Sequence, residues 1–99
     1  MRAVIRNWEL HRRTQTSLEQ LAEWCNPVVR GWIEYYGRFY KAAMYPVLEY
    51  LEGKLARWVA RKYKTYRGHR RRARHWLGRV ARRQPDLFAH WRFVRSAVA

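Results

Sequence analysis

Residues 18–40 read LEQLAEWCNPVVRGWIEYYGRFY, and this stretch decides the fold that we expect. At its start, the segment Thr16–Gln20 offers two overlapping capping boxes, either of which can begin a helix. The dipeptide Asn26-Pro27 predicts that this short helix stops and a second one starts, because Asn caps helices well and Pro suits the first helical position. The buried face of the first helix is predicted to carry Leu18, Leu21, Ala22 and Cys25.

Beyond Pro27, the apolar side chains of the second helix fall within an arc of roughly 140°, which is typical of a helix face that packs into a core. This predicted core stripe consists of Val28, Val29, Trp32, Ile33, Tyr36, Phe39 and Tyr40.

Three further segments show helical patterns. A third helix is expected from Pro46 to about Tyr63, and Gly68 predicts a break before a fourth. Pro85 ends the fourth helix, and Asp86 is placed to cap a last helical segment. The apolar arc of the third helix comprises Val47, Leu48, Leu51, Leu55, Trp58, Val59 and the stem of Lys62. The fourth helix presents Ala73, Trp76, Leu77, Val80 and Ala81, and after it Leu87, Phe88, Trp91, Val94 and Val98 recur at helical spacing.

The N-terminal arm carries Val4, Ile5 and Trp8 on one helical face but shows no cap, so it is either a helix or an ordered tail. Alternating β patterns are absent from the sequence. We therefore expect an all-α fold, a compact bundle of four or five short helices with an aromatic-rich core. We expect an arm or short helix at residues 1–15, the helical domain at 16–92 and a C-terminal tail at 93–99.

The charge of the chain is concentrated in one region. The 99 residues carry 22 Lys plus Arg against 7 Asp plus Glu, yet 48% of them are hydrophobic, which is typical of a folded chain rather than a basic tail. Residues 54–83 hold thirteen basic side chains and no acidic one. Such a density opposes folding unless an anion screens it, so an anionic partner is expected. Eighteen of the 22 cations are Arg, which either favours paired contacts with phosphate or reflects a GC-rich genome.

What the sequence lacks excludes several functions. The apolar runs are too short for a membrane span or a signal peptide, so we expect no membrane partner and a cytoplasmic location. Cys25 is the one cysteine, so the chain forms no internal disulfide and no multi-thiolate zinc site, and Cys25 is expected in the core. Asp86 is the one aspartate, which leaves no carboxylate cluster for two-metal chemistry. We expect no catalytic site, metal or cofactor, and function should depend on binding.

The candidates for nucleic-acid contact are cations and aromatic side chains. One arc of the third helix carries only cations and a tyrosine, whereas a solvated face usually mixes both signs of charge. Its members are Tyr50, Lys54, Arg57, Arg61 and Lys64, and the later basic candidates are Arg67, Arg70, Arg71, Arg72, Arg74 and Arg79. Phosphate contacts supply salt-dependent affinity, and aromatic stacking on structured RNA adds specificity. The stacking candidates are Tyr35, Tyr50 and Tyr66, which alternatively pack at a domain edge, and the histidines at 11, 69, 75 and 90 are predicted to lie on the surface or contact RNA.

Gly31 shares a face of the second helix with Tyr35 and Arg38. A glycine inside a helix costs about 1 kcal/mol relative to alanine, so Gly31 indicates a close approach to the backbone. Either another helix or an RNA backbone makes that approach, and the residues leave both interpretations open.

The composite motif NPVVRGWxxYYGxFY, followed by a long basic helical tract, closely resembles the maturase-specific domain of group II intron-encoded proteins, also called domain X or the thumb. The similarity continues through YPVLEYLEGKLARWVARKYKTYRGHRRRARHWL and then RRQPDLFAHW, as in bacterial members. It covers roughly residues 5–92.

The resemblance implies an all-helical domain that follows the fingers and palm of a reverse transcriptase in a bacterial cell. It also implies binding of group II intron RNA and, in a thumb, of an RNA/DNA template-primer duplex. The resemblance also implies which residues of this sequence face RNA. They are the motif residues Arg30, Gly31, Tyr35, Tyr36, Gly37 and Arg38, together with Lys41 and the later basic tract. The implied partners are intron RNA, the template-primer duplex and a fingers-palm domain.

The sequence itself contains no reverse transcriptase domain and no YxDD-type carboxylate pair. We therefore expect a maturase domain that binds group II intron RNA and assists its folding and splicing, with the RNA as the catalyst. The alternative is a thumb-like grip on the template-primer duplex. An excised domain, a remnant of an intron protein and a free-standing domain all stay open.

Overall fold

The computed structural model describes the backbone of residues 1–98 and the side chains of residues 1–94, and the described backbone contains helices and no strand. In chain order the elements are α1 (Arg2–Asn7), the 3-10 turn η1 (Leu10–Arg12), α2 (Leu18–Tyr36), α3 (Lys41–Lys62), the 3-10 turn η2 (Lys64–Tyr66), α4 (Arg70–Arg83) and α5 (Ala89–Val98). The all-α prediction is confirmed. No helix among the described residues is long and apolar enough to cross a membrane.

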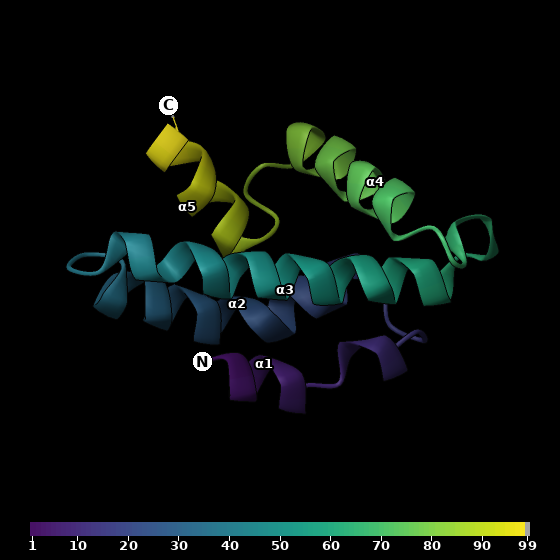
Figure 1. The fold of residues 1–99 in the computed structure, drawn as a ribbon, viewed down its shortest axis with the longest axis horizontal. Coiled ribbons are helices and arrows are strands. Elements are labelled where there is room, and N and C mark those ends of the chain that lie inside the picture. Colours follow the sequence, from purple (N-terminus) through teal and green to yellow (C-terminus); the bar gives the residue numbers. More distant parts are fainter. Residues whose placement is uncertain (99) are drawn as a thin grey trace.

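Helices α2 and α3 run antiparallel through the middle of the molecule (Figure 1). The N-terminal segment, α1 with η1, packs against α3 from one side, and α4 and α5 lie on the other. Helix α4 packs mainly on α3, whereas α5 packs mainly on α2. The turn that joins α2 to α3 and the η2 turn therefore lie at opposite ends of the molecule (Figure 1).

Helix α2 begins at a predicted capping box. Of the two alternatives, the box of Ser17 with Gln20 is the one that forms. The Ser17 hydroxyl accepts a hydrogen bond from the Gln20 backbone N–H at 3.1 Å, and the Gln20 side chain accepts one from the Ser17 N–H at 2.8 Å. Both bonds satisfy donors that the first turn of a helix leaves free.

The predicted break at Asn26-Pro27 is wrong, because α2 continues through Pro27 to Tyr36. Proline removes one backbone donor, but Cys25 and Val29 are fully buried on either side of it, and this packing keeps the helix in one piece. Asn26 is also buried and does not cap α2. Its Nδ2 donates to the Leu87 carbonyl at 2.8 Å, and its Oδ1 accepts from the Ala89 N–H at 2.9 Å.

Asn26 thus caps α5 from another helix, and the predicted cap by Asp86 is wrong. Asp86 is exposed and forms an ion pair with Arg92 at 3.8 Å. Sequence reasoning looked for the cap of α5 just before that helix and chose Asp86. Packing of α5 on α2 instead brings the Asn26 side chain to the backbone at the start of α5.

The third helix starts at Lys41, five residues before the predicted start at Pro46. Met44 is fully buried in the first turn, and Pro46 removes only one backbone hydrogen bond near the helix end. The predicted apolar arc is confirmed, because Val47, Leu48, Leu51, Leu55, Trp58 and Val59 are all buried.

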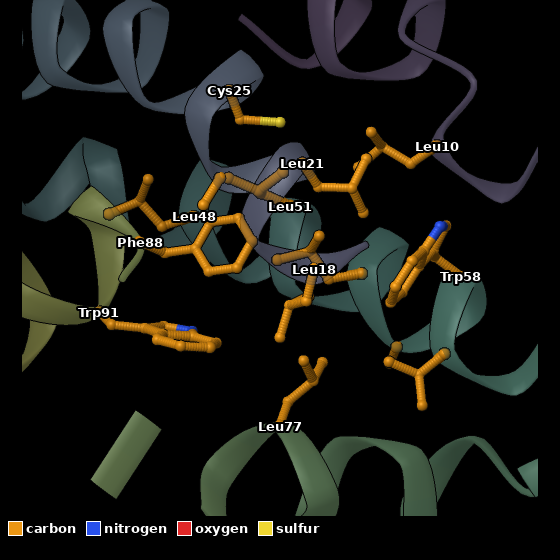
Figure 2. Close-up of a cluster of buried hydrophobic side chains, with 14 of the residues drawn as sticks. Leu10, Leu18, Leu21, Cys25, Leu48, Leu51, Trp58, Leu77, Phe88 and Trp91 are labelled. Carbon is orange, nitrogen blue, oxygen red and sulfur yellow. The ribbon is translucent and has the colours of Figure 1, made fainter. Parts of the chain in front are cut away.

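Figure 2 shows side chains from α2, α3, α4 and the start of α5 pointing toward one another in the core. Leu77 of α4 is fully buried, as are Phe88 and, nearly, Trp91 near the start of α5. The N-terminal arm is a helix rather than an ordered tail, and its Ile5 and the following Leu10 are buried in the same core. Cys25 is in the core as predicted, and burial raises the pKa of its thiol to about 12.

The predicted core stripe of α2 holds only in part. Val29 is buried and Trp32 and Ile33 are half-buried, but Val28, Tyr36, Phe39 and Tyr40 are exposed. Helix α2 ends at Tyr36, so the last two of these no longer follow its helical arc. Val94 of α5 is exposed as well, and the predicted packing of Val98 lies outside the residues whose side chains are described.

His90 is buried, so its predicted surface position is wrong. Its Nε2 lies 2.9 Å from Glu52 Oε1, and the Trp91 indole N–H donates to the same carboxylate at 3.0 Å. Burial by itself raises the pKa of Glu52, but the hydrogen bond and charge of His90, the Trp91 bond and the charge of Arg74 outweigh it and leave this pKa below its ordinary value. The cluster joins α3 to α5.

Candidate nucleic-acid interface

Four of the predicted cations meet around one hollow of about 670 Å³ at the η2 end of the molecule. Arg57 and Arg61 come from the second half of α3, Arg67 comes from the connection between η2 and α4, and Arg70 is the first residue of α4. Thr14, Ala60 and Gly68 complete the lining. We call this site the arginine hollow.

Buried contacts hold one wall of the arginine hollow in place. The Lys62 ammonium donates to the Thr14 and Thr16 carbonyls at 2.8 and 2.6 Å, and the Trp58 indole N–H donates to the Arg13 carbonyl at 2.8 Å. These bonds tie residues 13–16 to α3, so that Thr14 lines the hollow. Lys62 is therefore engaged with the protein backbone, in keeping with the prediction that its stem belongs to the apolar arc.

Gly68 shapes the opposite wall. Its φ of +77° lies in the left-handed region, which glycine adopts without the steric penalty of a Cβ. This turn reverses the chain between η2 and α4 and brings Arg67 and Arg70 to face the arginines of α3. The predicted break at Gly68 is confirmed.

The arginine hollow is a strongly positive environment. Among the described side chains, none of its four arginines forms an ion pair. Partial burial, and then the charges of Arg57, Arg61 and Arg12, lower the pKa of His11 below its ordinary value of 6.5, with Glu9 opposing them. Unpaired guanidinium groups can each bind two phosphate oxygens at once.

The other predicted basic residues have varied surroundings. Arg74 pairs with Glu49 across α3 and α4. Lys54 and Arg2 lie over the Tyr50 ring, with the Lys54 Nζ 5.2 Å and the Arg2 Cζ 5.8 Å from its centroid. The Arg79 Nη2 donates to the Tyr66 hydroxyl at 3.5 Å, so a second of the predicted stacking tyrosines lies beside a cation. Lys64, Arg71 and Arg72 are exposed and form no ion pair with a described side chain.

The predicted residues of the RGWxxYYGxFY motif lie at the other end of the molecule, around the turn from α2 to α3 (Figure 1). They are Arg30, Gly31, Tyr35, Tyr36, Gly37, Arg38 and, at the start of α3, Lys41. Lys41 and Arg57 stand sixteen residues apart on one helix, about 24 Å at 1.5 Å per residue. The structure thus separates the motif residues from the arginine hollow, and the remaining predicted basic residues belong to neither group.

Gly31 is exposed, and a Cβ added to it would meet nothing within 4 Å. The interpretation that another helix packs against Gly31 is therefore wrong for the described residues. Gly37 is the glycine with a packing role, because a Cβ there would lie 2.4 Å from the Ile33 carbonyl oxygen and 3.2 Å from the Phe93 ring.

Sequence reasoning missed Thr14 as part of the arginine hollow, and it did not connect His11, which was predicted to lie on the surface or contact RNA, with the arginines of α3. Both come from the N-terminal segment, and no local signal links them to residues 57–70. Only the docking of this segment on α3 reveals them. Among the described residues, no group of three or more His, Cys, Asp or Glu side chains is placed to hold a metal ion.

A comparison with protein families matches nearly the whole chain. The profile described as "Group II intron, maturase-specific domain" matches residues 1–93. The chain belongs to this family. Comparison of the maturase-specific domain with curated proteins gave no match, and comparison with solved structures gave none either. The matched region contains both groups of predicted site residues, the arginine hollow and the motif around the α2–α3 turn.

Proposed function

We propose that this domain binds folded group II intron RNA and assists its folding and splicing, with the RNA supplying the catalysis. The observation that carries the proposal is the arginine hollow, in which four guanidinium groups from α3, the η2–α4 connection and the start of α4 converge without a described acidic partner. Membership of the maturase-specific family supports a group II intron as the source of the RNA.

The construction of the hollow supports a folded RNA as the target. Lys62 and Trp58 hold one wall, and the turn at Gly68 shapes the other, so the fold sets the backbone positions from which its arginines extend. Cations that extend from set backbone positions suit phosphates whose positions are also set by tertiary folding. Phosphate contacts position the partner, and the shape of the RNA supplies the specificity.

The test is a binding titration over a salt series with a group II intron RNA and an unrelated structured RNA of equal length. We expect tighter binding of the intron RNA, and we expect Arg57→Gln/Arg61→Gln to lower the slope of log affinity against log salt by up to about 1.4 to 1.8. The matched control, Arg6→Gln/Arg92→Gln, removes the same charge from exposed positions away from the hollow and should leave the slope nearly unchanged.

Equal affinity for the two RNAs at physiological salt would refute recognition of the intron. An unchanged slope in the Arg57/Arg61 variant would remove the hollow from the interface. Tighter binding of an RNA/DNA hybrid than of intron RNA would instead support a grip on the template-primer duplex.

A further inference from the structure

The turn from α2 to α3 exposes four aromatic side chains at one end of the molecule, which we call the aromatic end. Their exposed fractions are 71% for Tyr35, 38% for Tyr36, 75% for Phe39 and 63% for Tyr40. A cluster of large exposed rings is uncommon on a protein that works alone, and such clusters mark contact surfaces.

These rings are presented on an ordered turn. The Gly37 N–H donates to the Ile33 carbonyl at 2.9 Å, and the Phe39 and Tyr40 N–H groups both donate to the Tyr36 carbonyl, at 3.3 and 2.6 Å. Phe93 of α5 packs against Gly37, so α5 occupies the space on one side of the turn. Among the described side chains, Tyr35 and Tyr36 meet edge to face with their ring centroids 4.8 Å apart, and Phe39 and Tyr40 leave most of their surface exposed.

A hollow of about 860 Å³ lies beside the Tyr35 ring. Gly31 and Gly37 contribute backbone without side chains to its lining, Phe93 closes one side, and Glu34 and Arg38 supply polar groups. The space next to Gly31 is open, since nothing lies within 4 Å of a Cβ built there. A flat ring can therefore approach the backbone closely at this point.

The chemistry of this end favours unpaired nucleobases over an apolar protein partner. Three of the four rings are tyrosines with a polar edge, and the exposed cations Arg38 and Lys41 flank them. Alternation of aromatic rings with cations is the pattern that binds single strands, with the bases stacked on the rings and the phosphates on the cations. The Glu34 carboxylate can accept a hydrogen bond from an exocyclic base amine.

We propose that the aromatic end binds unpaired bases of RNA by stacking on Tyr35 and Phe39, as a second contact separate from the arginine hollow. This inference rests on the proposed function, because it assumes that RNA is the partner. The aromatic end and the arginine hollow are about 24 Å apart along α3. One domain would therefore hold a folded part of the RNA and a nearby single-stranded part at the same time.

The test compares three versions of one RNA hairpin: blunt, with an unpaired overhang of about ten nucleotides, and with an abasic overhang of the same length. The abasic strand keeps the phosphates and loses the bases, so the difference between the two overhangs measures stacking alone. We expect wild type to bind the overhang with bases about tenfold more tightly than the abasic one, within the range of one or two stacked bases.

Substitutions then assign the effect to the rings. Phe39→Leu and Tyr35→Leu should each lose most of this preference while binding the blunt hairpin as wild type does, whereas Phe39→Trp should keep it. The matched control is Trp24→Leu, a partly exposed aromatic on the same helix that lies against Arg13 and Trp8. It should keep the full preference, and thermal melting will show that each variant is folded.

The outcomes separate the two proposals. If wild type binds none of the three hairpins and no intron RNA, the proposed function fails. If wild type binds the blunt hairpin but treats both overhangs alike, only the aromatic end is refuted. Retention of the preference in Phe39→Leu and Tyr35→Leu, or its equal loss in Trp24→Leu, would also refute it and would leave a protein partner as the explanation for the exposed rings.

Discussion

Replacing Asn26 with alanine is expected to loosen α5 from α2. The Asn26 side chain is only 7% exposed and makes two hydrogen bonds to backbone groups at the start of α5, the Leu87 carbonyl and the Ala89 N–H. With a net contribution of about 1 kcal/mol for each bond, the variant should lose about 2 kcal/mol of unfolding free energy. In a domain of this size that corresponds to a melting temperature lower by about 8 to 16 °C.

The assay is thermal and urea unfolding followed by circular dichroism, combined with hydrogen exchange of the backbone amides. Amides at the start of α5 should exchange faster in Asn26→Ala, while those in the middle of α3 should change only as far as global stability falls. Asn7→Ala is the control, because Asn7 is exposed and should shift stability by less than about 0.5 kcal/mol. A melting temperature within about 2 °C of wild type, or equal acceleration in α3 and α5, would refute the role of Asn26 as the anchor of α5.

Two further predictions concern pH. Because the charges of Arg57 and Arg61 help to hold the pKa of His11 below 6.5, an RNA phosphate between them should raise this pKa, so that affinity increases as pH falls between the free and bound values. NMR titration of the imidazole with and without a short RNA measures the shift, and an unchanged pKa at saturation would contradict it. The folded-state pKa of Glu52 is lowered, so its ionised form stabilises the fold above the ordinary value near 4.3, and this contribution disappears as pH falls through the folded pKa. Wild type should therefore exceed Glu52→Gln in urea stability at about pH 7 and lose that advantage as the pH falls through the folded-state pKa, whereas a constant difference would argue against the ionised carboxylate.

Local pattern was sufficient for much of the fold. A capping box within Thr16–Gln20, the apolar arc of α3 and the turn at Gly68 all appear in the structure as the sequence predicts, and the box is the one that Ser17 forms. These features depend on the helical period, on a side chain that reaches its own backbone and on the freedom of one glycine. Each acts within a few residues, so the chain nearby determines it.

Predictions failed where a residue has a partner distant in the sequence. Asn26 and Pro27 together are typical of a helix start, yet burial of the residues on both sides keeps α2 continuous. The Asn26 side chain hydrogen-bonds to the backbone before α5 instead. Phe39 is apolar and in phase with the core stripe, but the helix ends before it and leaves it exposed. Local patterns show that a side chain is apolar or suited to a helix cap. They cannot show which distant residues will pack against it.

By itself the sequence determined an all-helical domain of the maturase-specific family, with a basic tract in residues 54–83 and an aromatic motif before it. Only the tertiary structure decided which of these residues meet. It joins Arg57 and Arg61 to Arg67 and Arg70 in one hollow and places the exposed motif rings at the opposite end. The reason is physical: charge and helical period belong to each residue and its near neighbours, whereas a binding site depends on how the buried faces of separate helices pack together.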